Sequence, residues 1–140
     1  MKVLFKGFFL SFIALTSVVT AAHAGEAENT PLLAGLTCVA NNGATMKSTT
    51  TATERGLIVT STWGTLKKDF EAYVSGDSKK GKLLINLDSA KGTRYVLALG
   101  ADTTLVGASQ KVNGVIFEPK PALGPNPRLV TFVRCEVALR

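Results

Sequence analysis

The chain has 140 residues, 46% of them hydrophobic, and its 16 basic and 10 acidic side chains give a formal net charge of +6. Its single histidine, His23, lies in a segment that we expect to be cleaved off. The remaining chain has no imidazole, which excludes Ser-His-Asp and Cys-His catalysis as well as histidine-ligated zinc or haem.

The first 24 residues have the pattern of a secretory signal peptide. Lys2 and Lys6 give a positive start, Gly7–Val19 is an apolar run, and Ala22–Ala24 is a small-x-small cleavage site. The apolar run is shorter than the roughly 20 residues that span a membrane, and no later stretch is longer. We therefore predict an exported product, periplasmic or secreted, that consists of Gly25–Arg140 and has no transmembrane segment.

We expect residues 25–140 to form one all-β domain, because a chain of this length has room for a single hydrophobic core. Short β-like segments alternate with turns rich in glycine, asparagine and aspartate. In chain order these segments are Leu36–Ala40, Met46–Thr53, Leu57–Trp63, Lys82–Leu87, Arg94–Leu99, Thr104–Ser109, Val115–Glu118 and Arg128–Leu139. Their spacing predicts a small antiparallel β-barrel or sandwich of about seven to nine strands.

Two segments need separate interpretation. Thr65–Val74 fits both a helical stripe and a strand alternation, and we favour a strand because strands surround it. In the last segment the alternation places one set of residues on a common inner face: Leu129, Val133, Cys135, Val137 and Leu139.

Cys38 and Cys135 are the only cysteines, and a pair in an exported protein predicts a disulfide. The bond would tie the first predicted strand to the last and close a loop worth about 4–5 kcal/mol in the chain-entropy model. A redox-active or metal-binding pair is the alternative. Because CxxC spacing and histidine are both lacking, we expect no metal site and no cofactor.

Asp69 and Glu71 are the strongest candidates for catalysis. A strand would place both carboxylates on one face, where they could share a proton or hold a hard cation. Lys67 and Lys68 precede them, however, and a salt-bridged surface explains the same pattern. Because Ser-x-x-Lys and Gly-rich phosphate motifs are also lacking, we predict that the protein is not an enzyme, and a carboxylate- or metal-dependent enzyme is the least favoured alternative.

Positive charge is concentrated from Lys67 to Arg94, where seven basic residues outnumber four acidic ones. Such a surface suits anionic head groups, a cell-wall polymer or an acidic protein cleft, although lysines also protect strand edges from aggregation. Aromatic side chains that stack on bases are few, so we expect no nucleic-acid partner. Pro119–Pro127 is either a stiff connector or a rigid contact loop. Trp63, the only tryptophan, is expected in or near the core.

The segment Ser89–Tyr95 reads Ser-Ala-Lys-Gly-Thr-Arg-Tyr. It resembles the Ser-Ala-x-Gly-x-Arg-Tyr stretch of the membrane-bound and periplasmic C-type lysozyme inhibitors, which are small exported β-barrels, some with a disulfide between an early and a late strand. The resemblance implies that Ser89 enters the lysozyme cleft, where a hydroxyl and neighbouring donors bind the catalytic carboxylates. Lys91, Arg94 and Tyr95 are the accompanying candidates for partner binding.

These observations predict an exported, non-enzymatic binding protein that acts through surface loops on a protein or an envelope component. Lysozyme inhibition is the most specific form of this hypothesis. A structural subunit of the cell envelope is the main alternative.

Overall fold

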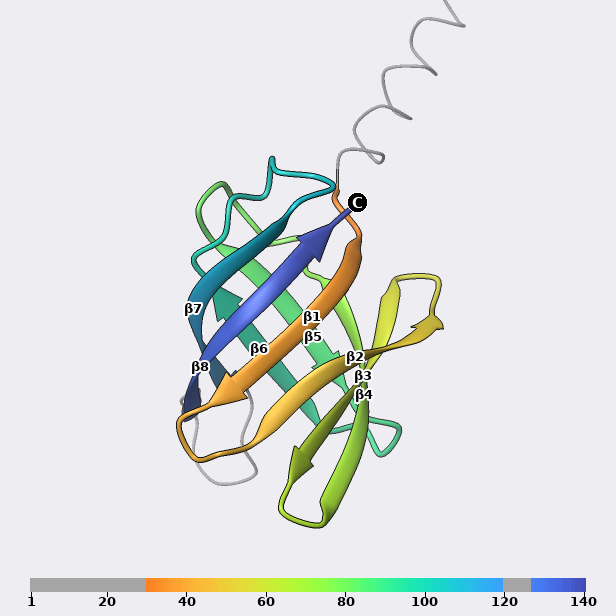
Figure 1. The fold of residues 1–140 in the computed structure, drawn as a ribbon, viewed down its shortest axis with the longest axis vertical. Helices are drawn as coiled ribbons and strands as arrows, with labels where there is room; N and C mark the ends of the chain where they lie inside the picture. The colour runs from red at the N-terminus through yellow and green to blue at the C-terminus, as the bar shows by residue number, and fades with distance from the viewer. Residues whose placement is uncertain (1–29, 120–126) are drawn as a thin grey trace, which may run out of the picture. The chain divides into compact units, whose positions relative to one another are not determined.

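The computed structural model describes residues 30–119 and 127–140, so the predicted signal peptide and most of the proline-rich loop lie outside the described residues. The described residues form eight strands: β1 Leu33–Ala40, β2 Thr45–Ala52, β3 Gly56–Trp63, β4 Leu66–Val74, β5 Leu83–Asp88, β6 Arg94–Leu99, β7 Ser109–Glu118 and β8 Arg128–Leu139. Each strand pairs antiparallel with the next, and β8 returns to pair with β1 (Figure 1). The predicted small antiparallel barrel is confirmed. No helix in this part of the chain has the length and apolar character needed to cross a membrane.

The ambiguous segment at residues 65–74 is the strand β4, as favoured, but the prediction of a strand at Thr104–Ser109 is wrong. Residues 104–108 belong to the loop between β6 and β7, where a carboxylate oxygen of Asp102 accepts hydrogen bonds from the backbone N–H and the hydroxyl of Thr104. A side chain that binds the backbone two residues on favours a turn over an extended ladder. The strand β7 begins only at Ser109 and then runs to Glu118.

Alternating side chains fill the barrel at the end where β1 begins and β8 finishes. The largest fully buried side chains there are aliphatic: Leu33, Leu36, Val59, Leu83, Ile85, Leu97, Leu99, Val137 and Leu139. No polar or charged side chain is buried among the described residues. An eight-stranded barrel has an interior just wide enough to be filled in this way, and these aliphatic side chains occupy the interior of this half.

The disulfide joins Cys38 to Cys135, as predicted. The two residues lie directly opposite each other in the β1–β8 ladder, and their Cα atoms are 4.1 Å apart. Both side chains are buried. The bond therefore fastens the seam where the barrel closes, across a sequence separation of 97 residues.

The inner face of β8 is interrupted near its start. The alternation predicts that Leu129 faces inward, but this side chain is 53% exposed. Ile116 pairs with Thr131 whereas Phe117 pairs with Leu129, so Val130 is an extra residue in β8. Such a β-bulge shifts the alternation for the residues before it, and Leu129 is therefore turned away from the core.

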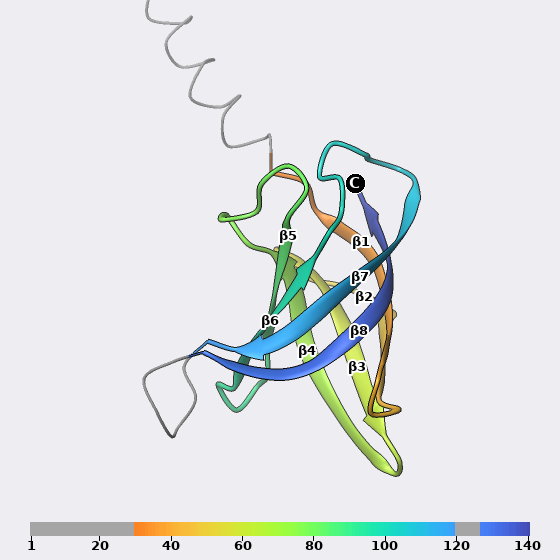
Figure 2. The same cartoon turned by 90° about the vertical axis from the view of Figure 1, so that its left-hand side faces the viewer.

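The hairpin of β3 and β4 extends beyond its neighbours (Figures 1 and 2). Its two strands pair as far as Trp63 and Leu66, but only Glu71–Val74 of β4 pair with β5. Trp63 has the inward parity of Leu57 and Val59, yet it is 60% exposed because it lies past the end of the closed barrel. The prediction that Trp63 lies in or near the core is therefore wrong.

Candidate functional site

The loop between β5 and β6 carries the heptapeptide singled out in the sequence. Its turn is closed by hydrogen bonds from the Thr93 N–H to the Ser89 Oγ, at 3.1 Å, and from the Gly92 N–H to the Ser89 carbonyl, at 3.0 Å. Gly92 has a φ of 85°, a left-handed conformation that favours glycine. This short, internally bonded loop holds Lys91 exposed at its tip.

The four predicted partner-binding residues do not share one surface. Ser89 and Lys91 line the same groove. Arg94 and Tyr95 are neighbours in a strand and so point to opposite faces. Arg94 lies outside and pairs with Asp88, with 2.8 Å between Nε and Oδ1, whereas the Tyr95 ring lies edge-on to Phe70, with the ring centres 5.9 Å apart.

The groove lies between the projecting β3–β4 hairpin and the β5–β6 loop, and has a volume of about 610 Å³. We call it the lysine groove, because three of its lining residues are lysines: Lys67, Lys68 and Lys91. Of the groove residues that the structure describes, only Asp69 is acidic. The groove exists because only Glu71–Val74 of β4 pair with β5. The edge of β4 before Glu71 is therefore not paired with β5, and it faces the β5–β6 loop. Lysines on an unpaired edge also protect it from aggregation, which is the alternative explanation of these lysines given in the sequence analysis.

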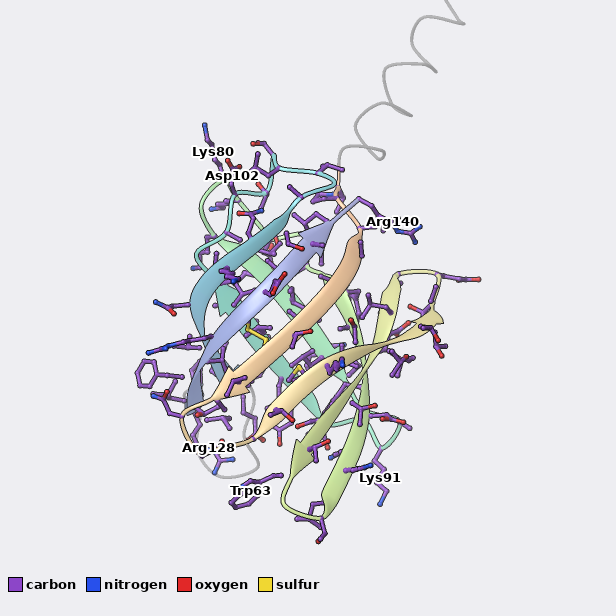
Figure 3. All side chains as sticks on the ribbon, viewed as in Figure 1. Trp63, Lys80, Lys91, Asp102, Arg128 and Arg140 are labelled. Carbon is purple, nitrogen blue, oxygen red and sulfur yellow. A yellow bond between two sulfur atoms is a disulfide. The ribbon has the colours of Figure 1, made fainter. Side chains whose placement is uncertain are left out.

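A second cavity opens inside the barrel mouth, at the end opposite the packed half. This end pocket has a volume of about 370 Å³. Its apolar and aromatic lining includes Met46, Trp63, Phe70, Leu87, Tyr95 and Ile116. Figure 3 places Trp63 and Lys91 at this end, while Lys80 and Arg140 lie at the other. Among the described residues, Lys68 is the only charged one that lines the pocket.

The end pocket stays open because the inward positions near the mouth carry small side chains. In β3 the inward position after Val59 holds only Ser61, and in β1 the inward position after Cys38 holds only Ala40. Phe70 and the disulfide residue Cys38, which also line the pocket, are both buried. The sequence alone did not lead to this pocket. The alternation in β3 and β4 does, however, place Trp63 and Lys68 on the inner face, and a lysine at an inward position indicates that the position is not part of a closed apolar core.

The carboxylates Asp69 and Glu71 share the outer face of β4, but each has its own partner. A carboxylate oxygen of Asp69 accepts a hydrogen bond of 2.7 Å from the Thr60 hydroxyl, and Glu71 forms an ion pair with Arg55. No cluster of three or more metal-ligating side chains occurs within residues 30–119 and 127–140. The two carboxylates are therefore parts of separate surface contacts in this structure.

Glu71 belongs to a charged ladder that crosses β4, β5 and β6. It lies opposite Asp88, which in turn lies opposite Arg94. Tyr73 donates a hydrogen bond of 2.7 Å to Asp88, and the Arg55 guanidinium lies 3.9 Å above the centre of the Tyr73 ring. Two neighbouring carboxylates are thus balanced by two arginines.

The ladder lowers the pKa of both carboxyl groups. The hydrogen bond from Arg55 is the main cause at Glu71. At Asp88, burial is the largest influence and raises the pKa, but hydrogen bonds from Arg94 and Tyr73, together with the positive charge of both arginines, outweigh it. The pKa of Tyr73 is raised, first by burial and then by its hydrogen bond to Asp88.

The ladder predicts that stability falls in acid. Because the folded pKa values of Glu71 and Asp88 lie below their ordinary 4.5 and 3.8, their contribution is present above those values and is lost as the pH falls through the folded values. We expect Asp88→Asn to lower the free energy of unfolding at pH 7 by up to about 1 kcal/mol and to flatten its dependence on pH below 5. Urea titrations at several pH values measure this. Asp77→Asn, at an exposed loop residue, is the control, and equal pH slopes in the two variants would contradict the prediction.

Comparison with known proteins gives no match: no family model, curated protein or solved structure is similar to this chain. Function is therefore inferred from the side chains that the barrel brings together.

Proposed function

We propose that this chain is an exported, non-enzymatic binding protein that inhibits a C-type lysozyme through the loop between β5 and β6. The observation that carries the proposal is the presentation of Ser89 and Lys91 on one tight loop beside the lysine groove. Lysozymes cleave glycosidic bonds with a pair of carboxyl groups in an open cleft. The Lys91 ammonium group at the tip and the Ser89 hydroxyl at the start of this loop are suitable donors to such carboxylates.

The organisation of the loop supports this role. Its internal hydrogen bonds fix the backbone before a partner arrives, so little conformational entropy is lost on docking. Lys91 is exposed at the tip, and the exposed side chains of Trp63 and Leu66 line the same groove from the β3–β4 hairpin. Exposed aromatic and aliphatic side chains beside a cationic tip are the kind of residues that anchor protein interfaces.

Export is part of the same proposal. A disulfide across the barrel seam is suited to an oxidising compartment such as the periplasm or the cell exterior. The positive charge around the groove favours an acidic partner, because complementary charge raises the association rate. We therefore expect stronger inhibition of acidic C-type lysozymes than of basic ones.

A cell-wall lysis assay tests the proposal. Purified, oxidised Gly25–Arg140 should inhibit an acidic C-type lysozyme at near-stoichiometric concentration. Lys91→Ala should weaken inhibition roughly tenfold, as the loss of a charge-assisted hydrogen bond does, without changing the melting temperature. Ser89→Ala should also weaken it, and Ser89→Thr, which keeps the hydroxyl that accepts from Thr93, should restore it in part.

Lys80→Ala is the matched control, because Lys80 is an exposed loop lysine at the opposite end of the barrel (Figure 3). Tyr95→Ala is a poor test, since Tyr95 packs against Phe70 and its loss would also affect folding. An absence of inhibition at large molar excess, with acidic and basic lysozymes alike, would refute the proposal.

A further inference from the structure

We infer that the end pocket is a binding site for a small anionic amphiphile, such as a medium-chain fatty acid, whose chain enters the barrel and whose acid group meets Lys68. The end pocket shares Ser61, Trp63 and Lys68 with the lysine groove but does not include Ser89 or Lys91, so this inference does not depend on lysozyme inhibition. It follows from the size, lining and charge of the pocket.

The size of the pocket suits one short apolar chain. Small-molecule sites have volumes of about 300–1,000 Å³ and are mostly apolar with a few polar groups. At about 370 Å³ the end pocket is near the lower limit of this range. The packed half of the barrel, filled by residues such as Leu97 and Val137, stops a ligand from going deeper. A chain must therefore enter through the mouth and end above the disulfide.

The lining of the pocket is suited to an apolar group. Phe70 and Tyr95 form one side, and Met46, Ile116 and Val133 contribute aliphatic or thioether surface. Trp63 lies at the rim with most of its side chain exposed to water. A ligand that covered this ring and filled the pocket would remove a large apolar area from solvent, which stabilises a complex by roughly 25 cal/mol for each Å².

The charge of the pocket selects an anion. Lys68 has inward parity, and its Nζ lies 5.5 Å from the centre of the Phe70 ring, at the top of the pocket wall. Within residues 30–119 and 127–140, no carboxylate oxygen forms an ion pair with Lys68. None of the pocket-lining residues in this part of the chain is an aspartate or a glutamate. An acid group at the mouth would meet this ammonium group, whereas a cationic head group would be repelled.

Tryptophan fluorescence provides a direct measurement, because Trp63 is the only tryptophan in the chain and lies at the rim. Titration with monomeric decanoate should shift the Trp63 emission and saturate. Along the series hexanoate, octanoate and decanoate, affinity should rise by up to roughly fourfold per methylene group. Decanol should bind more weakly than decanoate, and decyltrimethylammonium more weakly still.

Two pairs of matched variants locate the ligand. Lys68→Gln should weaken decanoate binding roughly fivefold and leave decanol binding unchanged, while Lys67→Gln, at the neighbouring outward position, should change neither. Ser61→Phe should fill the pocket and abolish binding, while Thr62→Phe, on the outer face of β3, should not. If Ser61→Phe does not fold, the comparison of Lys68→Gln with Lys67→Gln and the dependence of affinity on chain length still test whether the ligand occupies the pocket.

The inference is overturned if decanoate leaves the Trp63 emission unchanged below its micelle-forming concentration. Equal binding of decanoate, decanol and decyltrimethylammonium would also overturn it, as would identical behaviour of Lys68→Gln and Lys67→Gln. Binding to phosphatidylglycerol vesicles without binding to monomeric decanoate would indicate a membrane surface instead of a pocket ligand. None of these results bears on the lysis assay, so the two proposals fail separately.

Discussion

Replacing Cys38 and Cys135 together by alanine should lower the free energy of unfolding by about 4 kcal/mol. The disulfide closes a loop across 97 residues of sequence, and in the chain-entropy model a loop of this size is worth about 4.7 kcal/mol. The position of the bond strengthens the expectation, because it holds together the first and last strands, which are farthest apart in the chain and so the costliest to pair.

Urea denaturation followed by circular dichroism measures this effect. Oxidised wild type, wild type with dithiothreitol and Cys38→Ala/Cys135→Ala form the comparison. We expect reduced wild type and the double variant to have similar stabilities, both well below that of the oxidised protein. If the double variant were much less stable than the reduced wild type, the lost sulfur packing, and not the bond, would be the main cause.

Leu97→Ala should destabilise the barrel by about 2–5 kcal/mol, the range found when a buried leucine is truncated. Leu97 is fully buried in β6, in the packed half of the barrel, among Ile85, Leu99 and other close-packed aliphatic side chains. Neighbouring strands are fixed by the closed ladder and cannot collapse into the space that the missing methyl groups leave. The cost therefore includes a cavity as well as the lost transfer free energy.

Leu66→Ala is the matched control for this prediction. Leu66 is 68% exposed at the tip of the β3–β4 hairpin, and a change there should alter stability by less than about 0.5 kcal/mol. Thermal and urea melts of the two variants measure the contrast. Similar losses in both would mean that the stability of the barrel is not concentrated in its packed half.

The division of the barrel into a packed half and a hollow half connects stability with the two proposed functions. The packed half and the disulfide hold the strands in place, and the mouth is left free to carry small inward residues such as Ala40 and Ser61. Residues at the mouth can therefore be changed for function with little cost to the core. This separation is why the variants at Lys68 and Lys91 should keep the melting temperature.

Local patterns in the sequence determined much of this molecule. Short β-like segments between turn residues identified seven of the eight strands at least in part, and the strands around β4 favoured a strand there. The cysteine count was enough to predict the Cys38–Cys135 bond. The alternation of side chains along a strand placed Asp69 and Glu71 on one face.

Only the tertiary structure decided which inward positions are covered. Trp63 and Lys68 have the parity of core residues, but they lie where the β3–β4 hairpin has passed the end of β5. Parity states which face a side chain takes, whereas burial depends on how far the neighbouring strands extend. That extent is set by strand length and register between segments distant in sequence, and it turned two apparent core positions into the rim of a pocket.

The bulge at Val130 and the ladder around Asp88 have the same origin. An extra residue in β8 becomes visible only against its partner β7, so the exposure of Leu129 could not be read from β8 alone. Arg55 and Asp88 are 33 positions apart in the chain, and the barrel brings them within 3.7 Å. Composition and alternation thus determined the kind of fold, and the pairing of distant strands determined where its charges, its groove and its pocket lie.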